Sequence, residues 1–243
     1  MFSSDIIRVI VSFNTNLNLR LVCKAFAEPK YHISHNFKNT TNFVNVINVF
    51  EIHTFTLNYY NILNSRDIPE KFYNFINKQL PNCKIFICKH VEILKNNYIP
   101  ENCTDLVFES CILGITKLPE KCKALSFVDT KIIKLLDLSN IEYLSFKFMD
   151  FLSFPESLPN CKSFHCALSF IDQLPKYLPI CEKLTYYKID VYKLPVLPKV
   201  KCVKCVGTCI DEIQDLPNCR HLVIDKHIKI GNLAEGCMIE YVK

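Results

Sequence analysis

The feature that most constrains the fold is a short phrase that recurs along the chain from about residue 80 onward. Three copies are Leu118-Pro119-Glu120-Lys121-Cys122, Leu158-Pro159-Asn160-Cys161 and Leu178-Pro179-Ile180-Cys181. In each copy Leu-Pro precedes a cysteine, and Leu or Phe follows that cysteine three residues later. Recurrence at a fixed period indicates units that stack on one another, because one such unit cannot bury its own apolar side chains.

The repeat unit is short. Cys161, Cys181 and Cys202 follow one another at nearly equal intervals, so the period is roughly 20 residues, at the lower end of the range for stacked repeats. In each unit apolar residues then alternate with variable ones, which predicts one short strand per unit. Such a unit has no room for a helix on its return segment, so we expect an extended return fixed by its prolines. The aligned cysteine positions are Cys83, Cys103, Cys122, Ile141, Cys161, Cys181, Cys202, Cys219 and Cys237.

The cysteine ladder is interpreted as core packing. Ile141 occupies a cysteine position, and isoleucine can replace a small buried hydrophobe but not a metal ligand. One local alternative stays open, because Cys202, Cys205, Cys209 and Cys219 lie close enough in sequence to supply the four ligands that zinc prefers. The principal expectation is that the chain holds no metal and no cofactor.

Composition excludes several classes of protein. The chain has 243 residues, of which 49% are hydrophobic and 22% are charged, as expected for a globular protein with a sizeable core. A net charge of +5 without a run of Lys or Arg gives no reason to expect nucleic acid. No targeting segment or membrane span is visible, which predicts a cytoplasmic or nuclear protein with reduced thiols and no membrane partner. No catalytic motif stands out, so we do not expect an enzyme.

Residues between the inward positions of each strand are expected to face the concave side of the solenoid, because strand side chains alternate. In the unit that contains Cys202 these are Lys204, Val206 and Thr208. Solenoids use such faces for binding, and tyrosines are typical anchors of protein interfaces. The predicted target-binding residues are Asp105, Glu109, Tyr143, Lys147, His165, Lys183, Tyr187 and Lys204.

The N-terminal segment has a helical pattern. Ser3 or Ser4 can cap a helix whose apolar stripe is Ile6, Ile7, Ile10 and Phe13. A second helix is predicted over residues 17–26. Within the region that follows, Phe55, Leu57 and Tyr59 alternate with polar residues and predict a strand.

Two family resemblances follow from these residues. Phe2 to Phe13, followed by Leu19-Arg20-Leu21-Val22-Cys23-Lys24-Ala25-Phe26, resembles an F-box, and Val-Cys-Lys-x-aromatic is the most specific part. The repeats resemble short leucine-rich repeats. The combination implies an α+β protein with an F-box-like helical domain over residues 1–42, a linker or N-terminal cap over 43–79, and over 80–243 a leucine-rich-repeat solenoid with a parallel sheet on its concave face.

The resemblance implies a function. F-box domains dock onto a Skp-type adaptor and through it onto a cullin, so this chain is expected to be the substrate-recognition subunit of a ubiquitin ligase, with an unknown target protein on its repeats. The alternative is a stand-alone leucine-rich-repeat scaffold. Such pairings resemble giant-virus proteins of the mimivirus type, which would place the chain in the host cytoplasm. The implied adaptor-binding residues are Phe2, Ile6, Ile7, Ile10, Leu17, Val22, Cys23 and Phe26.

Overall fold

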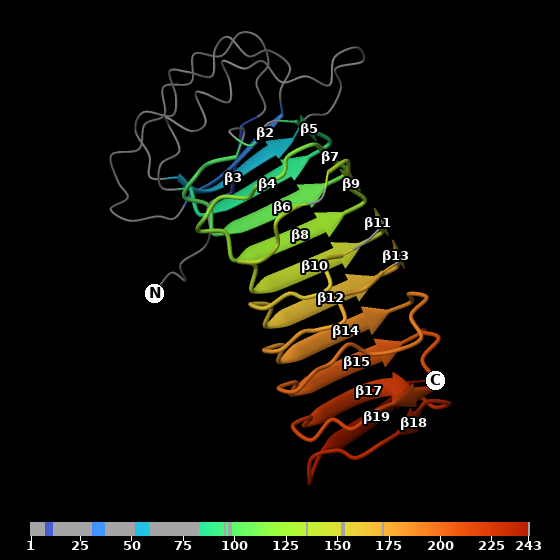
Figure 1. The fold of residues 1–243 in the computed structure, drawn as a ribbon. Helices are drawn as coiled ribbons and strands as arrows, with labels where there is room; N and C mark the ends of the chain where they lie inside the picture. Colours follow the sequence, from blue (N-terminus) through green and yellow to red (C-terminus); the bar gives the residue numbers. More distant parts are fainter. Residues whose placement is uncertain are drawn as a thin grey trace. The chain divides into compact units, whose positions relative to one another are not determined.

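The repeats form a parallel β-solenoid of about eight turns (Figure 1). The computed structural model describes residues 8–11, 31–36, 52–58, 83–94, 96, 99–134, 136–151, 154–171 and 173–242. Across these ranges every paired strand runs parallel to its neighbour, and none of the described segments is an α-helix. The solenoid and the parallel sheet are therefore as the sequence predicts. The chain divides into two compact units, Met1–Cys122 and Lys123–Lys243.

The first unit contains one sheet of longer strands and a pair of short ones. Its long strands pair in the order β1-β2-β3-β4-β6, and β5 pairs with β7. The strands are β1 (Arg8–Val11), β2 (Tyr31–Asn36), β3 (Ile52–Asn58), β4 (Ile85–Lys89), β5 (Glu92–Ile93), β6 (Asp105–Glu109) and β7 (Ile112–Leu113).

The second unit repeats this plan more regularly. Its long strands pair in the order β8-β10-β12-β14-β15-β17-β19, and short strands form the pairs β11-β13 and β16-β18. The long strands are β8 (Ala124–Val128), β10 (Tyr143–Lys147), β12 (Ser163–Ala167), β14 (Lys183–Tyr187), β15 (Cys202–Val206), β17 (His221–Asp225) and β19 (Met238–Val242). The short strands are β9 (Lys131–Ile132), β11 (Asp150–Phe151), β13 (Phe170–Ile171), β16 (Glu212–Ile213) and β18 (Lys229–Ile230).

Three described strands lie in the N-terminal part of the chain, and one of them differs from the predicted secondary structure. The strand predicted around Phe55 and Leu57 is confirmed as β3. Arg8–Val11, however, was predicted to be helical and instead forms β1, which pairs in parallel with β2. The run Val9-Ile10-Val11 consists of β-branched residues, which favour strands over helices, so a short apolar stripe was an ambiguous signal there. The second predicted helix lies outside the described residues.

The recurring Leu-Pro phrase forms the tight turn that enters β12, β14, β15 and β17. The amide of Cys161 donates a hydrogen bond to the carbonyl of Leu158 at 3.3 Å, and Cys181 bonds Leu178 at 3.2 Å. This is a β-turn with proline at its second position, where the restricted φ of proline matches the turn. The asparagine side chain of Asn160 also donates to the carbonyl of Ser139 in the preceding turn at 2.8 Å. The phrase therefore sets both the turn and its spacing from the next.

The core consists of inward side chains that stack from turn to turn. In β8, β10, β12 and β14, Leu or Phe occupies the second position and an aromatic residue or cysteine the fourth, and all of these are buried. Around Phe146, the Phe127 ring stacks at 5.1 Å and the Phe154 ring packs edge-on at 4.7 Å between centroids. Since the equivalent residues of neighbouring turns bury one another, the core is a continuous column.

One repeat is registered differently from the sequence alignment. Lys183 pairs with Cys202, which places Val200 and not Cys202 opposite Cys181. Val200 is fully buried, whereas Cys202 is partly exposed at an outward position. The outward residues of β15 are consequently Cys202, Lys204 and Val206, and the predicted outward residue Thr208 is buried. The reason is local: Leu197-Pro198-Lys199-Val200 repeats the turn phrase, with valine in the place of cysteine.

Replacing Phe146 by alanine should lower the free energy of unfolding by about 3–5 kcal/mol, because the cavity would lie inside the aromatic stack. Chemical denaturation measures this change. Tyr192→Ala is the matched control: Tyr192 is 70% exposed, and its loss should change stability by no more than about 0.5 kcal/mol. Equal effects of the two substitutions would contradict the assigned core.

Candidate protein-binding face

The outward positions of strands β8, β10, β12, β14 and β15 form a surface that we call the lysine face. Each strand presents its first, third and fifth residues, which gives fifteen positions. None of them is Asp or Glu. The cationic and aromatic residues of the lysine face are Tyr143, Lys147, His165, Lys183, Tyr187 and Lys204.

The lysine face brings together six of the eight predicted target-binding residues. Tyr143 is 51% exposed, and Lys147, Lys183 and Lys204 are exposed as well. The other two predicted residues, Asp105 and Glu109, lie in the first unit at outward positions of β6. Glu109 forms an ion pair with Lys89, and Asp105 accepts a hydrogen bond from the Thr104 hydroxyl.

The pKa of His165 responds to the positive charges of the lysine face. Its strand neighbours at the same register are Ser145 and Thr185, neither of which carries a charge. Partial burial lowers the pKa of His165 below its ordinary value, and the nearby ammonium groups of Lys183, Lys147 and Lys204 lower it further. Three cations therefore act on one point of the face, and none of its outward positions holds a carboxylate that would offset them.

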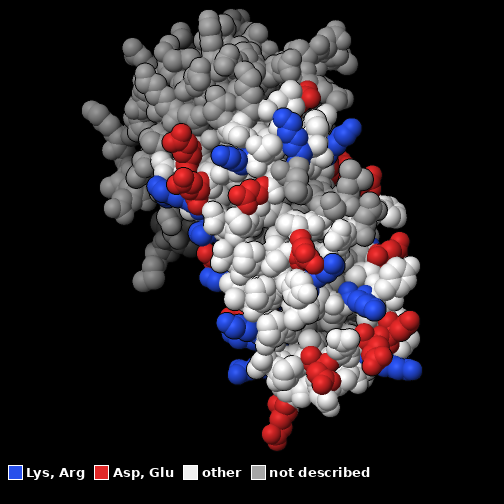
Figure 2. Space-filling model, in the orientation of Figure 1, with Lys and Arg blue, Asp and Glu red and all other residues white. Residues whose placement is uncertain are grey.

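Charges at the turn edge are arranged differently. Glu142 lies between Lys162, at 2.7 Å, and Lys123, at 3.5 Å, while Glu182 pairs with Lys201 at 3.0 Å. The hydrogen bond from Lys162 holds the pKa of the Glu142 carboxyl below its usual range. Figure 2 also shows oppositely charged side chains side by side at several places on one face of the described part. The turn edge thus alternates in sign, whereas no ion pair among the described residues involves a lysine of the lysine face.

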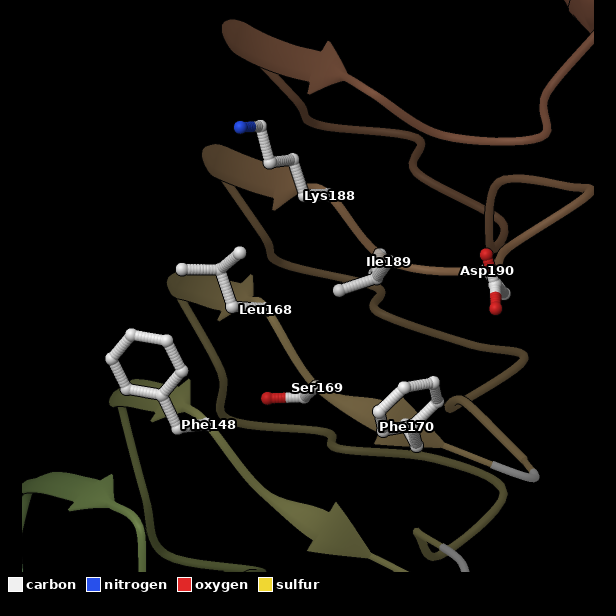
Figure 3. A pocket seen from close by; sticks show the side chains of 7 residues that line it. All are labelled: Phe148, Leu168, Ser169, Phe170, Lys188, Ile189 and Asp190. Atoms are coloured by element: carbon white, nitrogen blue, oxygen red, sulfur yellow. The ribbon is translucent and has the colours of Figure 1, made fainter.

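An open groove of about 330 Å³ lies at the ends of β10, β12 and β14 (Figure 3). Phe148, Leu168 and Lys188 follow these strands directly and line up along one wall. Phe170, which is 70% exposed, and Asp190 lie on the other side. The lining is completed by Ser169 and Ile189. The groove is mostly apolar and adjoins the lysine face, because Lys147 precedes Phe148 and Tyr187 precedes Lys188.

The groove wall is built from backbone in an unusual conformation. The residue after each of the strands β10, β12 and β14 has a left-handed φ, and Phe148 (54°) and Leu168 (50°) are the large apolar examples. Such a conformation costs a bulky residue roughly 1 kcal/mol or more. The next turn uses Gly207 at φ 65°, where a Cβ atom would come within 2.9 Å of the Lys188 side chain. The repeat itself therefore does not require a large residue at this position.

Hydrogen bonds hold the groove turn in place. The Ser169 hydroxyl donates to the carbonyl of Ala167 at 2.8 Å and accepts the amide of Met149 at 3.0 Å. Across two turns, these bonds fix the backbone that presents Phe148 and Leu168. No motif in the sequence predicted the groove. In the sequence, it corresponds to two large apolar residues, Phe148 and Leu168, that follow the strands of adjacent repeats at a position where other repeats have Asp129 or Gly207.

The cysteine ladder lies inside the solenoid except at Cys202 and Cys237, which are partly exposed. Cys161 and Cys181 are buried, and desolvation raises their pKa values to about 12 and about 11. Among the described residues no group of three or more His, Cys, Asp or Glu is arranged to hold a metal ion, and this includes the cysteines considered for zinc. The ladder thus supplies packing and leaves no reactive thiolate at its buried positions.

The implied adaptor-binding residues lie almost entirely outside the described part of the chain. Ile10 belongs to β1, and the other seven are in the undescribed ranges. Within the described residues, no helix is long and apolar enough to cross a membrane.

Thiol alkylation of the native protein should modify Cys202, Cys209 and Cys237 first, because these side chains are partly exposed. Cys161 and Cys181 should react only after unfolding, since burial withholds both access and the reactive thiolate. Mass spectrometry of alkylated peptides measures the order. Early modification of Cys181 would contradict its place in the core.

Replacing Lys183 by methionine should raise the pKa of His165 toward its ordinary value of 6.5, because one nearby positive charge is removed. NMR titration of the imidazole measures this shift. The lowered folded-state pKa means that the unfolded chain binds this proton more tightly, so stability falls as pH drops below about 6.5. Lys183→Met should reduce that loss, whereas Lys201→Met, at the turn edge, should leave the His165 titration unchanged.

Comparisons with known proteins assign no family to the chain. No protein-family model, curated protein or solved structure matches the chain.

Proposed function

We propose that this chain is a protein-recognition solenoid that binds a target on the lysine face, and that it serves as the substrate-recognition subunit of a Skp–cullin–F-box type ubiquitin ligase. The observation that carries the first part is the absence of acidic residues from fifteen adjacent outward positions of the described strands, which hold three lysines and two tyrosines. Tyrosines are enriched at protein interfaces, and complementary charge accelerates association.

The ligase part rests on the sequence of the N-terminal segment. Val22-Cys23-Lys24-Ala25-Phe26 matches the most specific portion of the F-box pattern. In this proposal, Ile10, Val22 and the other implied residues bury their apolar side chains in the Skp-type adaptor. The chain performs no bond chemistry. It raises the concentration of the target near the conjugating enzyme, in the cytoplasm of a host cell if the chain is viral.

A second candidate is a stand-alone interaction scaffold, and one observation favours it. Residues Arg8–Val11 form β1 and pair with β2, so part of the segment that resembles an F-box contributes to the sheet of the first unit. In that case the N-terminal strands extend the solenoid, and the lysine face binds a partner without an adaptor.

A purified Skp-type adaptor distinguishes the two candidates. The ligase proposal predicts capture by the wild-type chain and loss of capture by Val22→Asp and Ile10→Asp, because a carboxylate at a buried apolar contact is strongly unfavourable. Lys183→Met should bind the adaptor normally, and circular dichroism should show that each variant is folded. Capture that is unaffected by Val22→Asp, or no capture by wild type, would exclude the ligase role and leave the scaffold.

Proximity labelling in cells tests the target-binding part separately. Deleting the segment 1–30 should remove adaptor and cullin from the labelled set while the target remains. Changing Lys183 and Lys204 together to glutamate should remove the target while the adaptor remains. A labelled set that is unchanged by the glutamate variant would refute the lysine face as a binding surface.

A further inference from the structure

The groove and the lysine face share an edge. Lys147, at the end of β10, lies with its ammonium 4.9 Å from the centroid of the Phe148 ring, and the ammonium of Lys188 lies 5.4 Å from the centroid of Tyr187. A residue of the lysine face thus contacts a residue of the groove wall. A ligand that fills the groove must pass directly beside these cations.

The groove wall carries large apolar side chains although its backbone has a left-handed conformation. Phe148 and Leu168 adopt left-handed φ values at a position that the other described repeats fill with a polar or charged residue or with glycine: His90, Ser110, Asp129, Lys188 and Gly207. Strained residues of this kind cluster at ligand-binding sites, where the side chain serves recognition and not the turn. The large side chains of Phe148, Leu168 and Phe170 present an apolar surface suited to one large apolar side chain of a ligand.

The charge of the neighbouring surface defines the rest of the ligand. From Lys147 to Lys204 the sheet crosses three strand spacings, with an offset of two residues along the strands. The spacings of about 4.8 Å and the offset of about 6.6 Å separate the two Cα atoms by roughly 16 Å, which about five residues of extended chain span. Lys183 lies on one of the two intervening strands, and no outward position of the lysine face holds a carboxylate that would compete for the three lysines.

We propose that the lysine face and the groove together recognise an extended, acidic segment of the target protein that carries one large apolar side chain. The apolar side chain packs against Phe148, Leu168 and Phe170. The Asp and Glu side chains of the segment pair with Lys147, Lys183 and Lys204. This inference depends on the proposed target-binding function and names the chemistry of its target.

Charge complementarity favours an acidic protein segment over nucleic acid. Proteins that bind nucleic acid through its backbone often make six or more phosphate contacts, and the lysine face offers three lysines. The groove also places Asp190 opposite Lys188, where it would repel a phosphate backbone. A peptide can direct its apolar side chain into the groove and leave Asp190 at the solvent-exposed rim.

The test is selection from a library of random peptides of about 12 residues, which is more than enough to cross the roughly 16 Å between the outer lysines. The full chain is the bait. Enriched peptides should carry several Asp or Glu residues near one Phe, Tyr, Trp or Leu. Their affinity should fall as salt rises from about 0.1 M to about 0.5 M, since exposed ion pairs are screened.

Two sets of variants then assign the contacts. Changing Lys147, Lys183 and Lys204 to glutamate should weaken a selected peptide at least tenfold, while Lys193→Glu, a matched charge reversal on the return segment, should not. Leu168→Asn should also weaken the peptide about tenfold, because a large apolar contact is lost. Its melting temperature should stay constant or rise, since asparagine tolerates the left-handed turn better than leucine. Unchanged binding by Leu168→Asn would overturn the assigned groove.

The outcomes also separate this inference from the function on which it depends. Enriched peptides that lose binding in the glutamate variant, but lack acidic or large apolar residues, would overturn the inference and leave the lysine face as a binding surface. Enriched peptides that bind the glutamate variant as tightly as the wild-type chain would overturn both the inference and the lysine face as a binding surface. Tighter binding of a single-stranded oligonucleotide than of any selected peptide, at the same sites, would replace the protein target with nucleic acid.

Discussion

Every turn of this solenoid depends on its neighbours, because an inward side chain packs against side chains of the turns beside it. The size of one inward residue therefore depends on the size of its neighbours in the adjacent turns. Tyr186 is fully buried between Cys166 and Cys205, its partners at the same register of β12 and β15. Two small thiols make room for the large ring. Its hydroxyl has no hydrogen-bond partner among the described residues, which costs about 1–3 kcal/mol, so the packing of the column must compensate.

Because the buried column supplies the stability, the outward positions can vary. Their charged residues form two different arrangements. At the turn edge, Glu142 pairs with lysines of both neighbouring turns. On the lysine face, Lys183 and Lys204 act on His165 with no acidic residue at the outward positions, an arrangement that disfavours the protonated form of His165. The same contrast appears in the backbone, where Gly207 occupies a turn without strain and Leu168 occupies it with strain. The left-handed turn is common to the repeats and takes residues of several types, among which Phe148 and Leu168 are the large apolar ones.

The sequence predicted the turns and the core positions that recur in every repeat. Prediction failed where one residue pattern fitted two structures, or where no pattern marked the feature. The Leu-Pro phrase predicted the turns, and Ile141 correctly identified its column as packing. The paired cysteines near Cys202 suggested a register that the phrase at Leu197 contradicts, and the phrase was the better guide because it forms the turn hydrogen bond. At Arg8–Val11 a short apolar run fitted helix and strand equally. The groove could not be predicted, since its left-handed turn occurs at residues of many types.

The regular spacing of the strands also explains how a repeat protein can hold a specific site. Side chains on adjacent strands are separated by about 4.8 Å whatever their identity, so the distance between two lysines is set by the number of turns between them. Substituting an outward residue changes the ligand without disturbing the column, whereas substituting Phe146 or Tyr186 changes the column itself. In the proposed function, recognition and stability therefore reside on opposite faces of the same short strands. The groove is the exception, because the proposed recognition surface at Phe148 and Leu168 lies on the left-handed turn that closes the repeat.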